Sequence, residues 1–201
     1  MSEAALAAQT ADNAALNARC AANPREAADY TALLRRTPHA MKLTFLFNSA
    51  IDNHAALTRL LLADGFSPNT FHAEQSLLRI ATGYGSIDVL RLLLEAGAEA
   101  NSFDKMGDTP LKAAVSSGKL ACAHELIPHT DLRIFNASGK NVLHASIICN
   151  QLEIFKLLLP HFADDIDVRT IKKRPPAVTG GPYNSTPLLL ACEGGYHAIV
   201  K

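Results

Sequence analysis

Apolar residues recur at helical spacing in a unit that repeats along most of the chain. One clear copy is GDTPLKAAVSSGKLACAHELI, residues 107–127. Its first half predicts a short helix that Thr109 caps with its hydroxyl and that Pro110 begins, at a position where no N–H is needed. Gly118 is expected to end this helix in the left-handed conformation. The second half predicts another helix, with one apolar face formed by Leu120, Ala123, Leu126 and Ile127.

The aligned units begin at residues 44, 76, 109, 141 and 186, so the first three steps are 32 or 33 residues long. One column of the alignment tests whether the repeat is real. The position that ends the first helix holds Gly or Asn in every unit, and these two residues most readily adopt a positive φ. The five members of this column are Asn53, Gly85, Gly118, Asn150 and Gly195.

The units closely resemble the ankyrin repeat, which carries a T-P-L-H-x-A-A signature and an L-L-x-x-G-A ending. The matching runs are Thr109-Pro110-Leu111, Thr186-Pro187-Leu188, Leu143-His144-Ala145 and Leu93-Leu94-Glu95-Ala96-Gly97-Ala98. The motifs fall at the family's period of about 33 residues. The resemblance implies an all-α fold, a solenoid of stacked antiparallel helix pairs joined by β-hairpin-like fingers.

We therefore divide the chain into an N-terminal helical cap, residues 1–41, and an ankyrin-repeat domain, residues 42–201. The repeats lie near 44–75, 76–108, 109–140, 141–162 and 186–201, and the Gly- and Pro-containing segment 163–185 is an extended finger loop. In the cap, Asn23-Pro24 predicts the start of a helix, whereas residues 2–22 either form an outer capping helix or stay mobile. The last unit stops one turn into its second helix, which favours a fragment of a longer array.

The sequence departs from the family's pattern in two ways. The His of the signature is present as His144, but the same position elsewhere holds Phe47, Arg79, Lys112 and Leu189. In the family this His ties neighbouring loops together, so we expect the present stack to depend more on packing. Pro128 and Pro160 should end the third and fourth outer helices early, so the second half of the array is expected to be less regular.

Composition and motifs exclude several kinds of function. Lys+Arg and Asp+Glu both number 19, and a net charge of zero gives no bulk reason to expect nucleic acid or a membrane surface as partner. No apolar run approaches the roughly 20 residues of a membrane span. The four cysteines form no CxxC pair and are interpreted as reduced thiols of a cytoplasmic or nuclear protein.

The chain also lacks catalytic and phosphate-binding signatures, and its eight histidines are scattered. Cys149 is the single plausible nucleophile, but the alignment places no His beside it. We expect no enzyme, no metal and no cofactor.

The resemblance implies that a partner binds on the concave side, formed by the finger tips and the exposed ends of the inner helices. Phe71, Phe103 and Phe135 occupy equivalent finger positions and predict a ladder of rings about 8–10 Å apart. Such rings either anchor a partner or staple one finger to the next. The other candidate binding residues are Lys105, Met106 and Asp108 in a finger and Tyr84, Ser117 and Cys149 at the helix ends.

The leading hypothesis is a protein–protein interaction module, a scaffold whose partner is another protein. The alternative is a regulatory or substrate-recruiting segment of a longer multidomain protein. Weak self-association through the C-terminal half-repeat is a third expectation, because Leu188, Ile199 and Val200 would lack a neighbour there.

Overall fold

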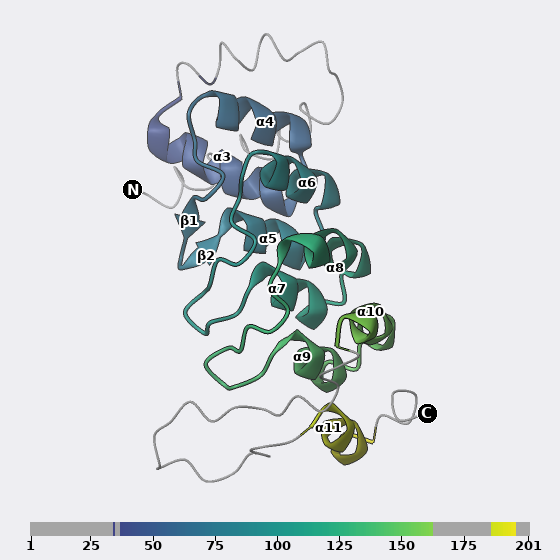
Figure 1. Cartoon of the computed structure of the whole chain (residues 1–201). Helices are drawn as coiled ribbons and strands as arrows, with labels where there is room; N and C mark the ends of the chain where they lie inside the picture. The colour runs from purple at the N-terminus through teal and green to yellow at the C-terminus, as the bar shows by residue number, and fades with distance from the viewer. Residues whose placement is uncertain (1–33, 35–36, 163–185, 196–201) are drawn as a thin grey trace.

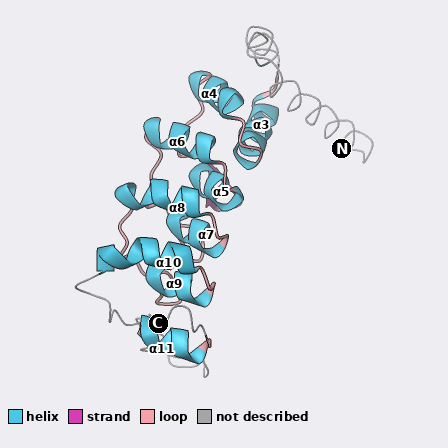
Figure 2. Ribbon diagram, turned by 90° about the vertical axis from the view of Figure 1, so that its right-hand side faces the viewer, coloured by secondary structure: helices cyan, strands magenta, loops and turns pink. Residues whose placement is uncertain are grey.

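The computed structural model describes residue 34 and residues 37–162 and 186–195. Their helices form two layers (Figure 1). The inner layer contains α3 (His39–Ile51), α5 (Leu77–Tyr84), α7 (Pro110–Ser116), α9 (Val142–Ile148) and α11 (Pro187–Glu193). The outer layer contains α4 (Ala55–Ala63), α6 (Ile87–Glu95), α8 (Leu120–Leu126) and α10 (Leu152–Leu158). Figure 2 shows the layers as two adjacent columns, so the expected solenoid of antiparallel helix pairs is confirmed.

A left-handed residue follows every inner helix and turns the chain back towards the outer layer. All five members of the Gly/Asn column have a positive φ, from 53° at Asn150 to 85° at Gly85. Because a side chain with a Cβ is disfavoured in this conformation, Gly and Asn are the residues that fit the turn. The column therefore predicted the backbone of the turn correctly in each unit.

Side-chain caps begin the inner helices of the later units. Ser76, Thr109, Asn141 and Thr186 each accept a hydrogen bond from the backbone N–H three residues on. The first unit differs, because its aligned start, Thr44, does not cap the helix. Helix α3 begins at His39 after Pro38, and the Thr44 hydroxyl donates to the carbonyl oxygen of Ala40 at 3.3 Å. Helix α3 thus runs across the boundary that we had placed between residues 41 and 42.

Three fingers project from the stack and lie below one another in Figure 1: finger 1 (Phe71–Ser76), finger 2 (Phe103–Asp108) and finger 3 (Phe135–Lys140). In finger 1, β1 (Phe71–His72) pairs antiparallel with β2 (Gln75–Ser76). Its two turn residues, Ala73 and Glu74, both have a positive φ, as the tightest hairpin turn requires.

Fingers 2 and 3 have one more residue in the turn, and a glycine takes its left-handed position. The φ angles of Gly107 and Gly139 are 71° and 70°. The Asp104 N–H donates to the Asp108 carbonyl at 3.1 Å, and the Asn136 N–H donates to the Lys140 carbonyl at 3.0 Å. The longer turn accounts for a step of 33 rather than 32 residues between the second and third units.

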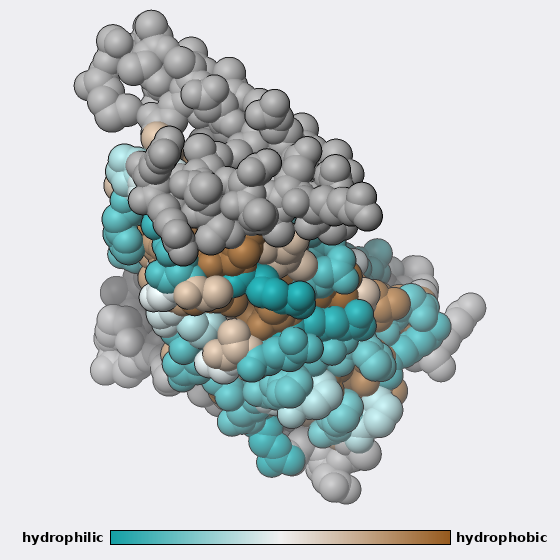
Figure 3. All heavy atoms as spheres, turned by 90° about the horizontal axis from the view of Figure 1, so that it is seen from above, coloured by the Kyte–Doolittle hydropathy of each residue, from teal (hydrophilic) through white to brown (hydrophobic). Residues whose placement is uncertain are grey.

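The hydrophobic core lies between the layers and continues from unit to unit. Leu46, Leu78, Leu111 and Leu143 occupy one position of successive inner helices and are each at most 1% exposed. Viewed from the α3–α4 end, polar residues occupy much of the visible described surface and apolar groups gather near the middle (Figure 3). Burial of this shared apolar surface is the main force that holds the units together.

The prolines end the outer helices early, as predicted. Helix α8 stops at Leu126, and the 3₁₀ turn η2 (Ile127–His129) contains Pro128. Helix α10 stops at Leu158 before η3 (Leu159–Phe162), which contains Pro160. The α-helical parts are 7 residues long, against 9 in α4 and α6.

Several expectations fall on residues outside the described ranges. These are the capping helix after Asn23-Pro24, the finger loop 163–185, and the self-association surface at Ile199, Val200 and the side chain of Leu188. Leu34 is described and is buried in the core. Among the described residues, no helix combines the length and the apolar character needed to cross a membrane.

We predict that Gly118→Ala and Gly83→Ala change stability in opposite directions. Gly118 has a φ of +64°, so an added Cβ should cost about 1–2 kcal/mol. Gly83 lies within α5, and a Cβ added there would meet no atom within 4 Å, so alanine should stabilise the helix by roughly 0.5–1 kcal/mol. Thermal unfolding followed by circular dichroism measures both, and a rise in Tm for Gly118→Ala would contradict the turn's role.

Candidate protein-interaction surface

Most of the large exposed apolar side chains lie on the fingers and at the ends of the inner helices, which together we call the finger face. Seven such side chains are exposed among the described residues. Five are on the finger face, where Tyr84 is 60% exposed and Phe103 is 53% exposed. The five are Phe71, Tyr84, Phe103, Met106 and Ile148. Four of them were candidates from the sequence, but Ile148 at the end of α9 was missed because its equivalents in the two preceding units are the small residues Gly83 and Ser116.

The remaining candidates lie on the same face with different degrees of exposure. Lys105 and Ser117 are exposed, whereas Asp108 and Cys149 are partly buried. Phe135 is also partly buried, and its ring lies 6.4 Å from the ring of His144. The three phenylalanines are therefore not equivalent, because Phe135 is partly buried beside His144 of the next unit, whereas Phe71 and Phe103 are about half exposed.

A groove of about 620 Å³ lies between fingers 2 and 3. Phe103 and Phe135 both line it, and Phe71 does not. The structure thus brings two of the three predicted rings to one site. The lining is Phe103, Asp104, Lys105, Gly107, Ile134, Phe135, Asn136 and Ala137.

A side-chain oxygen inside each longer finger fixes the shape of its turn. In finger 2, Asp104 Oδ1 accepts the N–H groups of Met106 at 2.8 Å and Asp108 at 2.9 Å. In finger 3, Asn136 Oδ1 accepts the N–H groups of Ser138 and Lys140, both at 3.0 Å. These bonds satisfy backbone donors that the turn would otherwise leave unpaired, so they hold the exposed residues in place.

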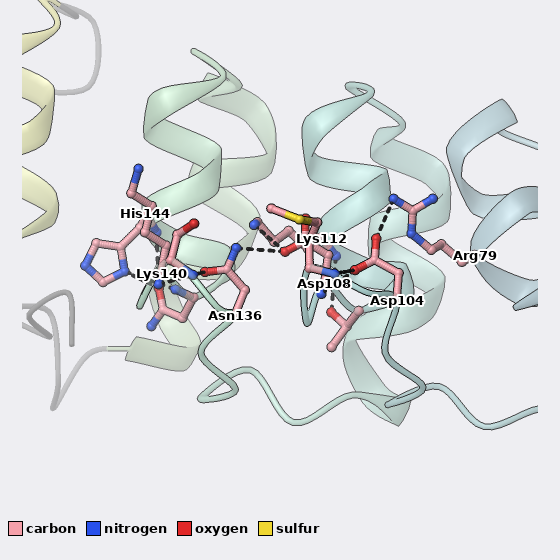
Figure 4. A network of polar contacts seen from close by, with 11 residues as sticks. Arg79, Asp104, Asp108, Lys112, Asn136, Lys140 and His144 are labelled. Atoms are coloured by element: carbon pink, nitrogen blue, oxygen red, sulfur yellow. Dashed lines mark hydrogen bonds and ion pairs between the residues drawn. The ribbon is translucent and has the colours of Figure 1, made fainter. Parts of the chain in front are cut away.

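Polar contacts also join each finger to its neighbours (Figure 4). Arg79 on α5 pairs with Asp104 of finger 2 at 2.9 Å. Asp108 of finger 2 accepts from Lys112 at 2.5 Å and from the side-chain amide of Asn136 in finger 3 at 2.8 Å.

These contacts correct one expectation from the sequence. Arg79 and Lys112 occupy the position of the family's His. Neither residue has an imidazole, but the units are still joined here by more than apolar packing. Their long cationic side chains reach finger carboxylates instead. His144 keeps the imidazole, and it forms a capping box with Asn141. The sequence sign of these contacts is that cations at this position occur together with Asp104 and Asp108 in the adjoining fingers.

Asparagines make a second series of contacts between units, away from the fingers. Asn53 Oδ1 accepts from the N–H groups of Asp88 and Val89 at the start of α6. Asn69 and Asn101 are equivalent residues 32 positions apart. Each accepts a backbone N–H of the next unit, from Glu99 at 2.7 Å and Asp131 at 2.9 Å. Sequence reasoning missed these two residues, although their spacing equals the repeat.

The cysteines differ in their surroundings. Cys192 is exposed, Cys149 is partly buried and Cys122 is buried. Burial raises the pKa of the Cys122 thiol. Among the residues with a described structure, no group of three or more His, Cys, Asp or Glu side chains is placed to hold a metal ion.

Comparison with known proteins identifies the family. The family described as "Ankyrin repeats (3 copies)" matches residues 78–172. The chain is 30% identical over 121 residues to a putative ankyrin repeat protein of Rickettsia bellii, and 30% identical over 122 residues to the putative ankyrin repeat protein YahD of Escherichia coli. These alignments cover 47% and 57% of this chain. Residues 78–172 therefore consist of ankyrin repeats, a family whose repeats are protein-interaction modules rather than catalytic domains.

The matched relatives are longer than the matched region. The chain covers 51% of the Rickettsia protein and 55% of YahD. It is also 29% identical over 144 residues to Protein VAPYRIN-LIKE of Medicago truncatula. That alignment covers 72% of this chain and 29% of the plant protein.

We predict that Asp104→Ala destabilises the protein more than Asp104→Asn does. Alanine removes the acceptor for two N–H groups and the partner of Arg79, at a cost of about 1–3 kcal/mol. Asparagine keeps the acceptor, as Asn136 does in finger 3, and loses the ion pair alone. Urea unfolding, with amide hydrogen exchange at Met106 and Asp108, tests this order. Equal exchange rates in wild type and Asp104→Ala would refute it.

We also predict the order in which three thiols react with iodoacetamide. Because burial raises the pKa of Cys122, its thiolate is scarcer at about pH 8, and its side chain is 1% exposed. Cys192 should therefore be alkylated first and Cys122 last, with Cys149 between them. Peptide mass spectrometry gives the rates, and full denaturation should equalise them. Similar rates for Cys122 and Cys192 in the folded protein would contradict the order.

Proposed function

We propose that the protein is an interaction module that holds another protein on its finger face, the concave side of the array. The observation that carries this proposal is the gathering of exposed apolar side chains there. Five of the seven that are exposed among the described residues lie on this one face, and they come from three different units. Exposed aromatic groups on a rigid support are typical anchors of protein interfaces.

The rigidity of the fingers favours binding as well. Asp104 and Asn136 fix their turns, Arg79 ties finger 2 to α5, and Asp108 ties finger 2 to finger 3. A surface that is already ordered loses less conformational entropy when a partner binds. This argument applies to Phe103 above all, since its finger has both kinds of contact and its ring stays 53% exposed.

The alternative role of the phenylalanines is to staple the fingers to the stack. Phe135 supports it in part, because its ring is partly buried and tilted against His144. Phe71 and Phe103 support binding, since about half of each side chain faces solvent. The three phenylalanines can therefore both bind a partner and hold the fingers to the stack, and Phe135 has the more structural role.

The test compares partner capture and stability in the same variants. We expect Phe71→Ala, Phe103→Ala and Phe135→Ala together to weaken capture from an extract of the source organism by at least tenfold, since a truncated anchor costs about 2 kcal/mol or more. Quantitative mass spectrometry measures the capture, and thermal melting measures the fold. Leu120→Ala, on the outer helix α8 and 44% exposed, is the matched control that should retain capture. If the triple variant melts at a lower temperature but captures the partner as well as wild type does, the proposal is wrong.

A second candidate role is recruitment or regulation within a longer multidomain protein. The length of the relatives favours it. One of them is the E3 ubiquitin-protein ligase KEG of Arabidopsis thaliana, which is 34% identical over 94 residues, 6% of its own length. In this role the array would bring a protein to a separate catalytic domain. The coding sequence beyond codon 201 decides the matter, because an immediate stop codon removes such a domain.

A further inference from the structure

The groove between fingers 2 and 3 combines an apolar lining with an unbalanced charge. Phe103, Ile134 and Phe135 supply apolar surface. The groove remains open, because Phe103 on its border is still half-exposed. Its volume of about 620 Å³ falls within the range of sites that hold small ligands or a few side chains. A segment of a partner chain can therefore place one large apolar side chain there while its backbone stays near the surface.

The acidic groups at this groove are already neutralised by the protein itself. Asp104 pairs with Arg79, and its side chain is 6% exposed. Asp108 pairs with Lys112 and accepts from Asn136. Both carboxylates are therefore occupied by cations or donors of the stack, and neither offers a free negative charge to a ligand.

Two lysines, in contrast, have no carboxylate partner within the described ranges. Lys105 lines the groove and is exposed. Lys140 ends finger 3, where its N–H donates to Asn136, itself a groove residue (Figure 4). The charges within the pairs Arg79–Asp104 and Lys112–Asp108 cancel. Lys105 and Lys140 therefore give the border of the groove a positive charge, although the net charge of the chain is zero.

We propose that this groove binds an extended segment of a partner protein in which an aromatic or large aliphatic side chain is flanked by Asp or Glu. The inference rests on the proposed function and specifies the chemistry of the partner. The apolar side chain packs between Phe103 and Phe135, and the acidic residues lie beside Lys105 and Lys140. Glu74 at the tip of finger 1 repels the acidic residues and so favours fingers 2 and 3 as their place.

The probe is a random peptide library displayed on phage and selected on the whole chain. We expect the selected peptides to carry an excess of Asp and Glu around an aromatic or large aliphatic residue. A selected peptide, synthesised with a fluorescent label, should bind at least tenfold more weakly to Lys105→Glu/Lys140→Glu. Its binding to wild type should also weaken between about 0.05 M and 0.5 M salt, because exposed charges are screened.

A matched control reverses two cations on the outer helices, Arg59→Glu/Lys156→Glu, with the same change in net charge. This variant should bind the peptide as wild type does, and melting curves should show that both double variants fold. Selected peptides without excess acidic residues, no selected peptides, or unchanged binding to Lys105→Glu/Lys140→Glu each overturn the inference. Tighter binding of a labelled oligouridylate that depends on the same lysines overturns it too, since the ligand would then be nucleic acid.

The Phe103→Ala variant separates this inference from the proposed function. If peptides of any charge lose binding in Phe103→Ala but not in the lysine variant, the interaction surface stands and its preference for acidic segments fails. If the peptides bind Phe103→Ala and Phe135→Ala as tightly as wild type, the groove is not the binding site and the proposed function loses its support.

Discussion

A pair of helices of seven to thirteen residues cannot bury its apolar face by itself, and this constraint governs the whole molecule. Each pair needs another pair on at least one side, so the chain must return to the same orientation every 32 or 33 residues. The left-handed residue after each inner helix makes this return possible. The shared leucine position, represented by Leu46, Leu78, Leu111 and Leu143, then fills the space between successive pairs.

Polar groups give the stack its precision once packing has brought the units together. Apolar contacts are tolerant of small displacements, whereas hydrogen bonds and ion pairs have narrow distance and angle limits. Asp108 and Asn53 each bind a defined atom of the following unit, and Arg79 binds Asp104 in finger 2 of its own unit. The exposed side chains of the finger face therefore keep their relative positions, which is a condition for selective recognition.

The sequence was sufficient for those features that depend on local backbone chemistry. The Gly/Asn column, the caps at Thr109 and Asn141, and the early helix ends before Pro128 and Pro160 were all predictable. These features require particular residues at particular places, so a repeat alignment finds them. It also placed Phe71 and Phe103 at equivalent exposed positions.

Features that depend on which side chain reaches which atom were not predictable in the same way. The family's pattern does not contain the residue types that form the contact of Arg79 with Asp104. No sequence motif therefore predicted this contact. The difference between Phe103 and Phe135 arises from the packing of His144, and Ile148 has small equivalents, Gly83 and Ser116, in the second and third units. Helix α3 starts at His39, five residues before Thr44, so its start does not follow the pattern of the later units.

Several hydrogen bonds between units share a direction along the chain. Asn53 binds residues 35 and 36 positions later, Asn69 and Asn101 each bind a residue 30 positions later, and Asp108 binds one 28 positions later. In these bonds the earlier unit presents the acceptor and the later unit the donor, whereas Arg91 donates in the opposite sense to Glu125. Duplication of the gene segment for one repeat would copy both the acceptors and the donors of such contacts. The added repeat would therefore stack between the existing repeats in the same orientation. The array is in this sense self-complementary, and it can lengthen through recombination without a new interface having to arise.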